Sequence, residues 1–508
     1  MPATQSMGLA PLSGAPQTAG LAAGLRFCRE RVLGLNAVLA LAVALFCLLL
    51  VPRSMADPDI WWHLRNAQTM LTQHIFVTHD TYSFTVQGVP WIDHEWLAEL
   101  PFYLAWKAGG STGVYLVTET LTLSIFLPVL FLCWKASRSA LTACVATATV
   151  VLLATVSLGP RTLLFGWLCL VCELVLLERF RHDAKAALAL PPLYLLWVNL
   201  HGSWLIGLGV LAIVVASGHL PLQRAWIYAD RFTRQQSRML AVAAAGIIPA
   251  LFCNPWGWRL VAYPFNFAFR QTLNVASIDE WRSLQLHSMR GDVFLAAVAL
   301  LVGRQLWRPR AWSVQEVLLL AGGLYAAMTH ERFLFLLAIL AAPIAARSFP
   351  GEPVKQEAVP RPGYHAALIF ALLFVAFTFV HKAGRADDAA MRQYPTPALM
   401  AAVSRLPPDS HLMNEYGWGG YLEWHQPQTP VFIDSRVDIF EYNDVLRDYL
   451  DIIHIENTAA LLGKYHIKAV LFENKTPLVY LLRRTGDWRV TYEDANAVLL
   501  QRTAPLQQ

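Results

Sequence analysis

The sequence is short of charged residues and of cysteine. Only 15% of its 508 residues are Asp, Glu, Lys or Arg, whereas a soluble protein of this size carries about 25%. All seven cysteines lie at or before Cys253, so the C-terminal part must fold without disulfides. Cys169 and Cys172 form a CxxC, but without further ligands at similar spacing we expect them to pack as small apolar residues. The shortage of charge excludes an ordinary soluble protein.

Apolar residues come in long blocks instead of alternating with polar ones. A helix needs about 20 apolar residues to cross a bilayer, and eleven blocks of near that length predict spanning helices. They are 32–52, 113–134, 140–158, 162–178, 187–200, 202–220, 239–253, 291–307, 313–329, 332–347 and 364–381. The first block is too long, and its flank too basic, for a cleaved signal peptide, so we expect a retained anchor. The lipid bilayer is therefore the first predicted partner.

The positions of Lys and Arg predict the orientation, because cytoplasmic loops carry an excess of them. Three arginines precede the first block, which places the N-terminus inside. If successive segments between the spans lie alternately outside and inside, the inner segments hold 18 basic residues and the longer outer segments about nine. An odd number of spans leaves the C-terminal part outside. The inner loops account for the net charge of +5, so we expect no nucleic-acid partner.

Composition divides the chain into three parts. Residues 1–31 are predicted to be a disordered cytoplasmic N-terminus, since they are rich in small and polar residues without apolar periodicity. Residues 32–383 are predicted to form the membrane bundle, with a long first outer loop at 53–112. Residues 384–508 predict an outer α/β domain. The expected fold class is an α-helical polytopic membrane protein of about eleven transmembrane helices with a C-terminal soluble α/β domain.

The C-terminal part alternates strand and helix patterns. Short β-type runs lie at Leu412–Asn414, Tyr421–Trp424, Val431–Asp434, Ala469–Phe472 and Val498–Gln501. Helical stretches at 442–453 and 457–465 lie between them. Strands that alternate with helices predict a small α/β domain, and about 120 residues can bury a core of their own.

The first outer loop contains two candidate amphipathic helices. Apolar residues recur there at helical spacing: Ile60, Trp61, Leu64, Leu71 and Ile75. This pattern predicts a helix that lies in the membrane interface with its tryptophans at headgroup depth. Residues 93–107 predict a second helix of the same kind.

Unusual polar residues all fall at the predicted outer ends of the spans. They are Asp57, Asp59, Arg161, Asn199, His201, Asn254, His330, Glu331 and Arg332. Charge near lipid is costly, which makes such residues candidates for function. A transporter is expected to place ionisable groups near mid-membrane, and we expect no charged residue in the middle of a span here. The pattern favours an enzyme that acts at the outer surface on a lipid-anchored substrate.

The first outer loop also carries the residue types that glycosyl transfer requires. Asp57 and Asp59 are followed at once by Trp62 and His63. A carboxylate can deprotonate an attacking hydroxyl or hold a divalent metal, Mg²⁺ or Mn²⁺, against a phosphate. An arginine can bind that phosphate with two hydrogen bonds, and a histidine can donate to the leaving oxygen. A tryptophan can stack on a sugar face.

On these residues the sequence resembles the GT-C class of polytopic glycosyltransferases. This class includes protein mannosyltransferases and lipid A aminoarabinose transferases, and the resemblance is strongest to uncharacterised bacterial members. It covers most of residues 33–503. The shared motifs are DPD-WWHL from Asp57, PW-HEWL from Pro90, N-HG from Asn199, NPWG from Asn254, NEY-WGGYL from Asn414 and VFIDSR from Val431.

The resemblance implies a polyprenyl-phosphate sugar as donor and inversion at the anomeric carbon. It also implies that one acidic residue of the first loop acts as base or metal ligand. Asp57 and Asp59 are the candidates, and we prefer Asp59 because it is nearer the amphipathic helix. Arg161 and Arg332 are then the candidates for the donor phosphate, an assignment that rests mainly on topology.

Several of these candidates have a structural alternative. Asp57 and Asp59 can cap the helix that follows them. His94 and Glu95, candidates for a substrate or metal contact, can simply begin the second loop helix. Asn254 begins a sequence typical of a tight turn.

Further alternatives concern the helix ends and the C-terminal part. Asn199 and His201 can hydrogen-bond the backbone at a helix break. Arg161 lies at a helix start, where a cation is unfavourable unless an anion lies beside it. Arg332 can pair with Glu331 next to His330. Asp434 and Arg436, which are candidates for substrate binding, can instead form a structural ion pair.

The predicted function is an inverting glycosyltransferase of the bacterial cytoplasmic (inner) membrane. It would transfer a sugar from polyprenyl phosphate to a lipid, glycan or protein acceptor at the outer face. Two alternatives stay open. One is a transporter or flippase of a lipid-linked glycan, which moves its substrate without bond cleavage. The other is a non-catalytic scaffold of envelope-glycan assembly.

Overall fold

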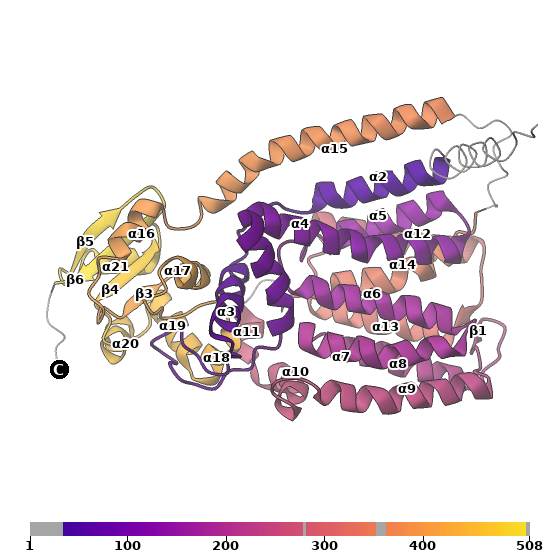
Figure 1. Cartoon of the computed structure of the whole chain (residues 1–508), viewed down its shortest axis with the longest axis horizontal. Coiled ribbons are helices and arrows are strands. Elements are labelled where there is room, and N and C mark those ends of the chain that lie inside the picture. Colours follow the sequence, from indigo (N-terminus) through magenta and orange to yellow (C-terminus); the bar gives the residue numbers. More distant parts are fainter. Residues whose placement is uncertain (1–33, 278–280, 352–361, 504–508) are drawn as a thin grey trace, which may run out of the picture.

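The computed structural model describes residues 34–277, 281–351 and 362–503. A bundle of roughly parallel helices forms the larger part, and a smaller α/β part lies beyond one of its ends (Figure 1). The predicted disordered N-terminus at 1–31 falls outside the described residues.

Each of the eleven predicted ranges contains a helix. The helices are α2 (Leu35–Leu50), α4 (Trp96–Ser137), α5 (Ala140–Ala154), α6 (Leu163–Phe180), α7 (Leu190–Leu200), α8 (Trp204–His219), α9 (Arg234–Phe252), α12 (Met289–Trp307), α13 (Val314–Thr329), α14 (Leu334–Ser348) and α15 (Pro362–Met391). By length and composition α4 is the one described helix that could cross a membrane, and six further apolar helices have 10–17 residues. The number of spans and their orientation stay predictions.

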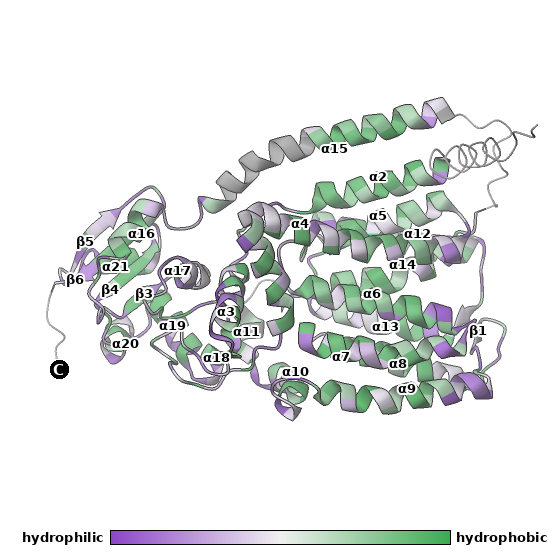
Figure 2. Cartoon of the chain, viewed as in Figure 1, coloured by the Kyte–Doolittle hydropathy of each residue, from purple (hydrophilic) through white to green (hydrophobic). Residues whose placement is uncertain are grey.

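Helix α14 forms the centre of the bundle. Eleven of its 15 residues are buried, and it packs against α4, α5 and α13. Phe335 at its start stacks on Trp167 of α6, with ring centroids 3.7 Å apart. A helix that is apolar on all sides is expected in the interior. Helix α15 instead lies on the flank beside α2, and apolar residues run along the bundle helices (Figure 2).

Helix α4 is two helices joined at a glycine pair. Gly109 and Gly110 have non-helical backbone angles, and Gly110 has a φ of 58°, which favours glycine. A Cβ on Gly113 would lie 2.0 Å from the carbonyl oxygen of Ala105, so the chain passes itself closely at this point. The break confirms that 93–107 and 113–134 are separate helices.

Helix α3 (Asp59–Gln73) is not the interfacial helix that the sequence predicted. Trp61 and Trp62 are 1% and 5% exposed, because α3 packs between α4 and α17 (Gly419–His425) of the C-terminal part. Trp61 makes edge contacts with the rings of Trp106 and Tyr421. The apolar spacing was right for a helix, but protein rather than lipid covers it.

The expectation of no charge within a span was also wrong. Glu173 lies in the middle of α6 and is fully buried. The Tyr194 hydroxyl donates a hydrogen bond of 2.9 Å to its Oε1, and a Cβ on Gly207 would lie 2.8 Å from its Oε2. A carboxyl group packed on every side is an interhelical contact and offers no substrate path.

The C-terminal part contains a four-stranded mixed sheet. The strands are β3 (Leu412–Asn414), β4 (Ala469–Glu473), β5 (Trp488–Glu493) and β6 (Ala497–Arg502), in the order β3-β4-β6-β5. β3 and β4 are parallel, and the other two pairs are antiparallel. Around the sheet lie α16 (Pro397–Val403), α17, α18 (Val437–Tyr442), α19 (Val445–Ile453), α20 (Thr458–Lys464) and α21 (Pro477–Leu482).

Three of the five predicted strands are confirmed, and the other two are corrected. Tyr421–Trp424 lies inside α17, because Gly419 and Gly420 let this helix approach other backbone closely: a Cβ on Gly420 would lie 2.8 Å from the Pro58 carbonyl oxygen. Val431–Asp434 makes only isolated bridges at Val431, to Leu412 and to Ser83. Strand β5 had not been predicted.

The first outer loop joins the C-terminal part through a buried ion network. The Arg436 guanidinium contacts Asp80 of the loop at 2.7 Å and Asp434 at 2.5 Å, and all three side chains are fully buried. It also lies about 5 Å from the ring centres of Tyr82 and Trp91. Burial alone would raise the pKa of Asp434, but contact with Arg436 holds it below its usual range. Loop and C-terminal part therefore pack as one body.

We expect Arg436→Ala to lower the free energy of unfolding by about 3–5 kcal/mol, because it leaves buried carboxylates without a counter-charge. Chemical unfolding of the detergent-purified protein measures the change. Arg405→Ala, which removes an exposed arginine of the same part, is expected to change stability by less than about 0.5 kcal/mol. Similar small effects of both variants would contradict the network.

Candidate functional site

The predicted polar residues gather at the end of the bundle that faces the C-terminal part, near α3, α10 (Trp258–Arg270) and α11 (Thr272–Ser277) (Figure 1). Most of them lie at a helix end or next to one. Asp57 precedes α3, Glu95 precedes α4, Arg161 precedes α6 and His201 follows α7. Helix packing thus brings together residues that lie far apart in the sequence.

Asp57, Asp59 and Arg161 form the first cluster. The Arg161 guanidinium makes an ion pair with the Asp57 carboxylate, which supplies the anion expected beside a cation at a helix start. Asp57 also accepts a hydrogen bond of 3.0 Å from the backbone N–H of Asp59, although the cap residue of α3 is Pro58 and no side chain of the described residues caps this helix. This contact leaves the Asp59 carboxylate available for others.

Asp59 has the electrostatic environment of a base that works near neutral pH. Burial, helped by the negative charge of Asp57, raises the pKa of Asp59 to about 7, while Arg161 opposes the rise. Its Oδ1 accepts a hydrogen bond of 3.3 Å from the Trp62 indole, which also donates to Ser435 at 3.1 Å. The residue is half-buried, and a base with a pKa near the working pH is well matched to its task.

Glu95 and three histidines form the second cluster. Glu95 lies 3.1 Å from His201 Nε2, 3.6 Å from His63 Nε2 and 3.7 Å from His94 Nε2. Burial would raise the pKa of Glu95, but His94 and His201 hold it below its usual range. Burial lowers the pKa of His63 and of His94 to about 4. A charged carboxylate therefore lies beside the rings of His63 and His94, which are neutral at pH 7 and can each donate one hydrogen bond and accept another.

The two clusters act on each other electrostatically and form one site. The charge of Glu95 contributes to the raised pKa of Asp59, and the charge of Asp57 acts on the ring of His63. His94 is the most exposed ring of the second cluster, with 25% of its side chain accessible. It is the ring best placed to meet a substrate.

Glu99, Asn66 and Asp93 form a buried polar layer next to His63 that was not predicted from the sequence. Glu99 accepts from His63 Nδ1 at 2.8 Å and from Asn66 Nδ2 at 2.9 Å. Asn66 also donates to Asp93 at 2.5 Å, and burial raises the pKa of Asp93 to about 7. The available signal was the spacing of Glu95 and Glu99 at the start of α4, and of His63 and Asn66 within α3, since residues three or four apart lie on one side of a helix.

Asn199 and Asn254 have the structural roles that were their alternatives. Asn199 accepts from the Trp96 indole at 3.1 Å and donates to the Cys253 carbonyl oxygen at 3.0 Å, which ties α7 to its neighbours. Asn254 closes the predicted turn by accepting from the backbone N–H of Trp256. Both also line an apolar groove of about 450 Å³ with Trp96 and Leu196.

His330, Glu331 and Arg332 lie at the same end of the bundle, but their contacts differ from the predicted pairing of Arg332 with Glu331. Glu331 pairs with Arg290 at 2.6 Å rather than with Arg332. The Arg332 guanidinium lies 4.2 Å from the centre of the Trp281 ring, and His330 contacts the Trp281 carbonyl oxygen at 2.5 Å. Arg332 acts on the pKa of His94, so its charge reaches the second cluster.

Three predicted substrate contacts are corrected by their burial. Trp62 is 5% exposed and stacks on His63, with ring centroids 3.7 Å apart. Asp434 and Arg436 belong to the buried ion network. None of the three has a face for a sugar, because protein surrounds each of them.

A second cavity, of about 300 Å³, adjoins the site. Tyr263 stacks on His94 at 4.5 Å and donates a hydrogen bond of 3.0 Å to Asp438. Tyr263 and Asp438 line this cavity together with Trp91 and Arg270. Aromatic rings beside hydrogen-bonding groups are suited to a polar ligand with apolar faces, such as a sugar.

The sequence predicted a divalent metal at Asp57 and Asp59. Among the residues that the structure describes, no three His, Cys, Asp or Glu side chains have the arrangement of a metal centre. Arg161 already provides a cation beside Asp57. The divalent ion expected at Asp57 and Asp59 stays a prediction, and no chemical step below uses one.

Comparisons with known proteins establish the fold. No protein-family model matches the sequence, and no curated protein matches it. The oligosaccharyltransferase of Archaeoglobus fulgidus, solved with a tethered acceptor peptide, aligns with a TM-score of 0.55 and 12% identity over 88% of this chain and 70% of its own. ArnT from Cupriavidus metallidurans in the apo state aligns with a TM-score of 0.52 and 13% identity over 94% of this chain and 98% of its own. Both of these glycosyltransferases have the GT-C fold, so the chain has this fold too, and the predicted fold is confirmed.

We expect Gly166→Ala to lower the free energy of unfolding by about 1–3 kcal/mol, because the new methyl group overpacks the site. Its Cβ would lie 2.2 Å from Ser203 Oγ and 3.1 Å from His201 Nδ1. Gly209→Ala is the matched control, since its Cβ meets nothing within 4 Å, and it should raise stability by about 0.5–1 kcal/mol. Unfolding curves of both variants measure this, and a stabilised Gly166→Ala would contradict the close approach.

Proposed function

We propose that this chain is an inverting membrane glycosyltransferase that transfers a sugar from a polyprenyl-phosphate donor to an acceptor hydroxyl. The observation that carries the proposal is the cluster of Asp57, Asp59 and Arg161 beside the histidine-rich cluster at one end of a GT-C fold. We place the reaction at the outer face of the bacterial cytoplasmic membrane.

The Asp59 carboxylate acts as the base. It takes the proton of the acceptor hydroxyl as the hydroxyl oxygen attacks the anomeric carbon of the donor. A new carbon–oxygen bond forms on one face of the sugar while the bond to the phosphate oxygen breaks on the other, which inverts the centre. The electron pair of the broken bond leaves with the lipid phosphate. A general base of this kind contributes about 10²–10⁴-fold to a rate.

Arg161 and Arg332 bind the phosphate and stabilise the charge that develops on it. Asp57 holds Arg161 through their ion pair, and the ring of Trp281 supports Arg332 at 4.2 Å. Charge-assisted hydrogen bonds that form before the reaction need no rearrangement during it. The half-buried ring of His94 donates a further hydrogen bond.

The two cavities beside the site suit the two substrates. The apolar groove along Trp96 and Leu196 suits a prenyl chain that enters from the bilayer. The cavity with Trp91, Tyr263 and Asp438 suits an acceptor of a glycan kind. The transporter alternative gains nothing from Glu173, because that carboxyl is enclosed.

Asp59→Asn should abolish transfer while the protein is produced at a normal level, since the amide cannot take a proton. Lipid extracts from cells that lack the gene, and from cells that carry only Asp59→Asn, should both accumulate the donor, as measured by mass spectrometry. Asp487→Asn, which changes an exposed carboxyl of the C-terminal part, should restore the normal lipid pool. Full activity of both Asp57→Asn and Asp59→Asn would refute the proposal.

The rate of transfer should rise with pH and reach half its maximum near pH 7, because Asp59 must be ionised and its pKa is raised to about 7. Asp57→Asn removes a negative charge and should move the midpoint to lower pH. Arg161→Gln removes a positive charge and should move it to higher pH. Rates measured between pH 5 and 9 test this, and midpoint shifts of the same sign in both variants would count against Asp59 as the base.

A further inference from the structure

A polar cavity lies at the end of the bundle opposite the carboxylates. Its volume is about 720 Å³, and the ends of α4, α6, α13 and α14 surround it together with the segment between α8 and α9. Strands β1 (Ile227–Tyr228) and β2 (Trp312–Ser313) lie at this end of the bundle (Figure 1). We call it the inner cavity, because the sequence predicts the cytoplasm on this side.

Cations outnumber carboxylates in the lining of the inner cavity. Five lining side chains are basic: Lys135, Arg138, Arg181, Arg231 and Arg347. Three are acidic, Glu178, Asp230 and Glu316, which leaves a surplus of two positive charges. A cavity of one net sign with apolar walls concentrates ions of the opposite sign.

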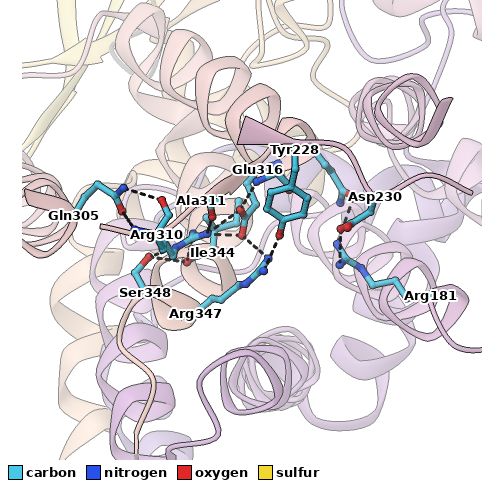
Figure 3. A network of polar contacts seen from close by, with 12 residues as sticks. Arg181, Tyr228, Asp230, Gln305, Arg310, Ala311, Glu316, Ile344, Arg347 and Ser348 are labelled. Atoms are coloured by element: carbon cyan, nitrogen blue, oxygen red, sulfur yellow. Dashed lines mark hydrogen bonds and ion pairs between the residues drawn. The ribbon is translucent and has the colours of Figure 1, made fainter. Parts of the chain in front are cut away.

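Two of the three carboxylates of the inner cavity are already paired with cations. Glu316 accepts from Arg310 at 2.9 Å and from Arg347 at 3.2 Å, and Figure 3 shows it between these two arginines. Glu178 lies 3.1 Å from Lys135 and 3.3 Å from Arg181. Each of these two carboxylates therefore serves two cations, and Arg347 keeps 42% of its side chain accessible despite its pair.

Two arginines of the lining have no such partner. The side chains of Arg138 and Arg231 make no hydrogen bond or ion pair with any residue that the structure describes. Both are exposed and come from different segments, one after α4 and the other before α9. A guanidinium of this kind can offer two parallel hydrogen bonds to a phosphate.

The inner cavity also has an apolar floor. Leu174, Leu177, Leu319, Leu340 and Ile344 line it from three helices. A free inorganic ion cannot make apolar contacts with such a surface, whereas the hydrocarbon chain of a lipid phosphate can. Basic pockets between membrane helices on the cytoplasmic side bind anionic headgroups in this way.

We propose that the inner cavity binds a phosphate group, held by Arg138, Arg231 and Arg347, with the apolar floor covering the chain of an anionic lipid. Basic residues in inner loops are common for reasons of orientation alone. In this chain, however, arginines from three segments line one cavity that has apolar walls. The site is independent of the transfer chemistry at the other end, so either can be true without the other.

Binding to the full-length protein in neutral detergent tests the proposal. The probes are dioctanoyl phosphatidylglycerol, inorganic phosphate and uncharged dioctanoylglycerol, and native mass spectrometry or thermal shift gives the affinity. The test variant is Arg138→Gln with Arg231→Gln, two exposed residues whose loss should not disturb folding. The matched control is Arg224→Gln with Arg238→Gln, which removes two exposed arginines of the same predicted side that do not line the cavity.

We expect saturable binding of phosphatidylglycerol that weakens about tenfold or more in the test variant and stays within about twofold in the control. Dioctanoylglycerol should not bind. Binding of inorganic phosphate with the same loss in the test variant would place the source of the phosphate in solution instead of in the lipid. No saturable binding of either phosphate probe, or an equal loss in both double variants, would overturn the proposal.

Discussion

The structure depends on one buried guanidinium, that of Arg436. It lies between Asp80 of the first outer loop and Asp434 of the C-terminal part, at 2.7 and 2.5 Å. A buried charge is costly unless it is paired, and these two carboxylates are its close partners, so the loop and the C-terminal part must keep one relative position. Ser435 is then held where it accepts from the Trp62 indole, and that indole also donates to Asp59. The position of the candidate base thus follows from an ion pair that no substrate touches.

The two ends of the bundle have opposite chemical character. At one end carboxylates and histidines lie beside a few arginines, which is the arrangement that the proposed transfer reaction uses. At the other end cations are in surplus around a cavity with an apolar floor. In each case the charged groups lie at helix termini, because the packed middle of the bundle, with α14 at its centre, leaves no room for hydration.

The helices were predictable because their signal is local. Apolar blocks predicted all eleven ranges, and the acidic and histidine motifs predicted most of the site. The wrong predictions concern what packs against a residue in the folded protein. Trp61 and Trp62 have the same spacing whether lipid or protein covers them, and Tyr421–Trp424 has a strand-like composition although it packs as a helix against α3. Glu99, Asn66 and Asp93 were missed because a buried polar layer needs the contacts of several segments to be recognised.

The sequence by itself determined a helical bundle with its polar residues at helix ends and a small α/β part after it. Those features follow from apolar periodicity, charge distribution and turn residues, which act over a few residues. Only the tertiary structure decided that Arg161 pairs with Asp57, that Glu331 pairs with Arg290, and that Arg436 is enclosed. Such pairings join residues more than 30 positions apart, and burial strengthens them in a way that composition cannot reveal. The physical reason is that solvent exclusion, which sets the strength of each charge, is a property of packing.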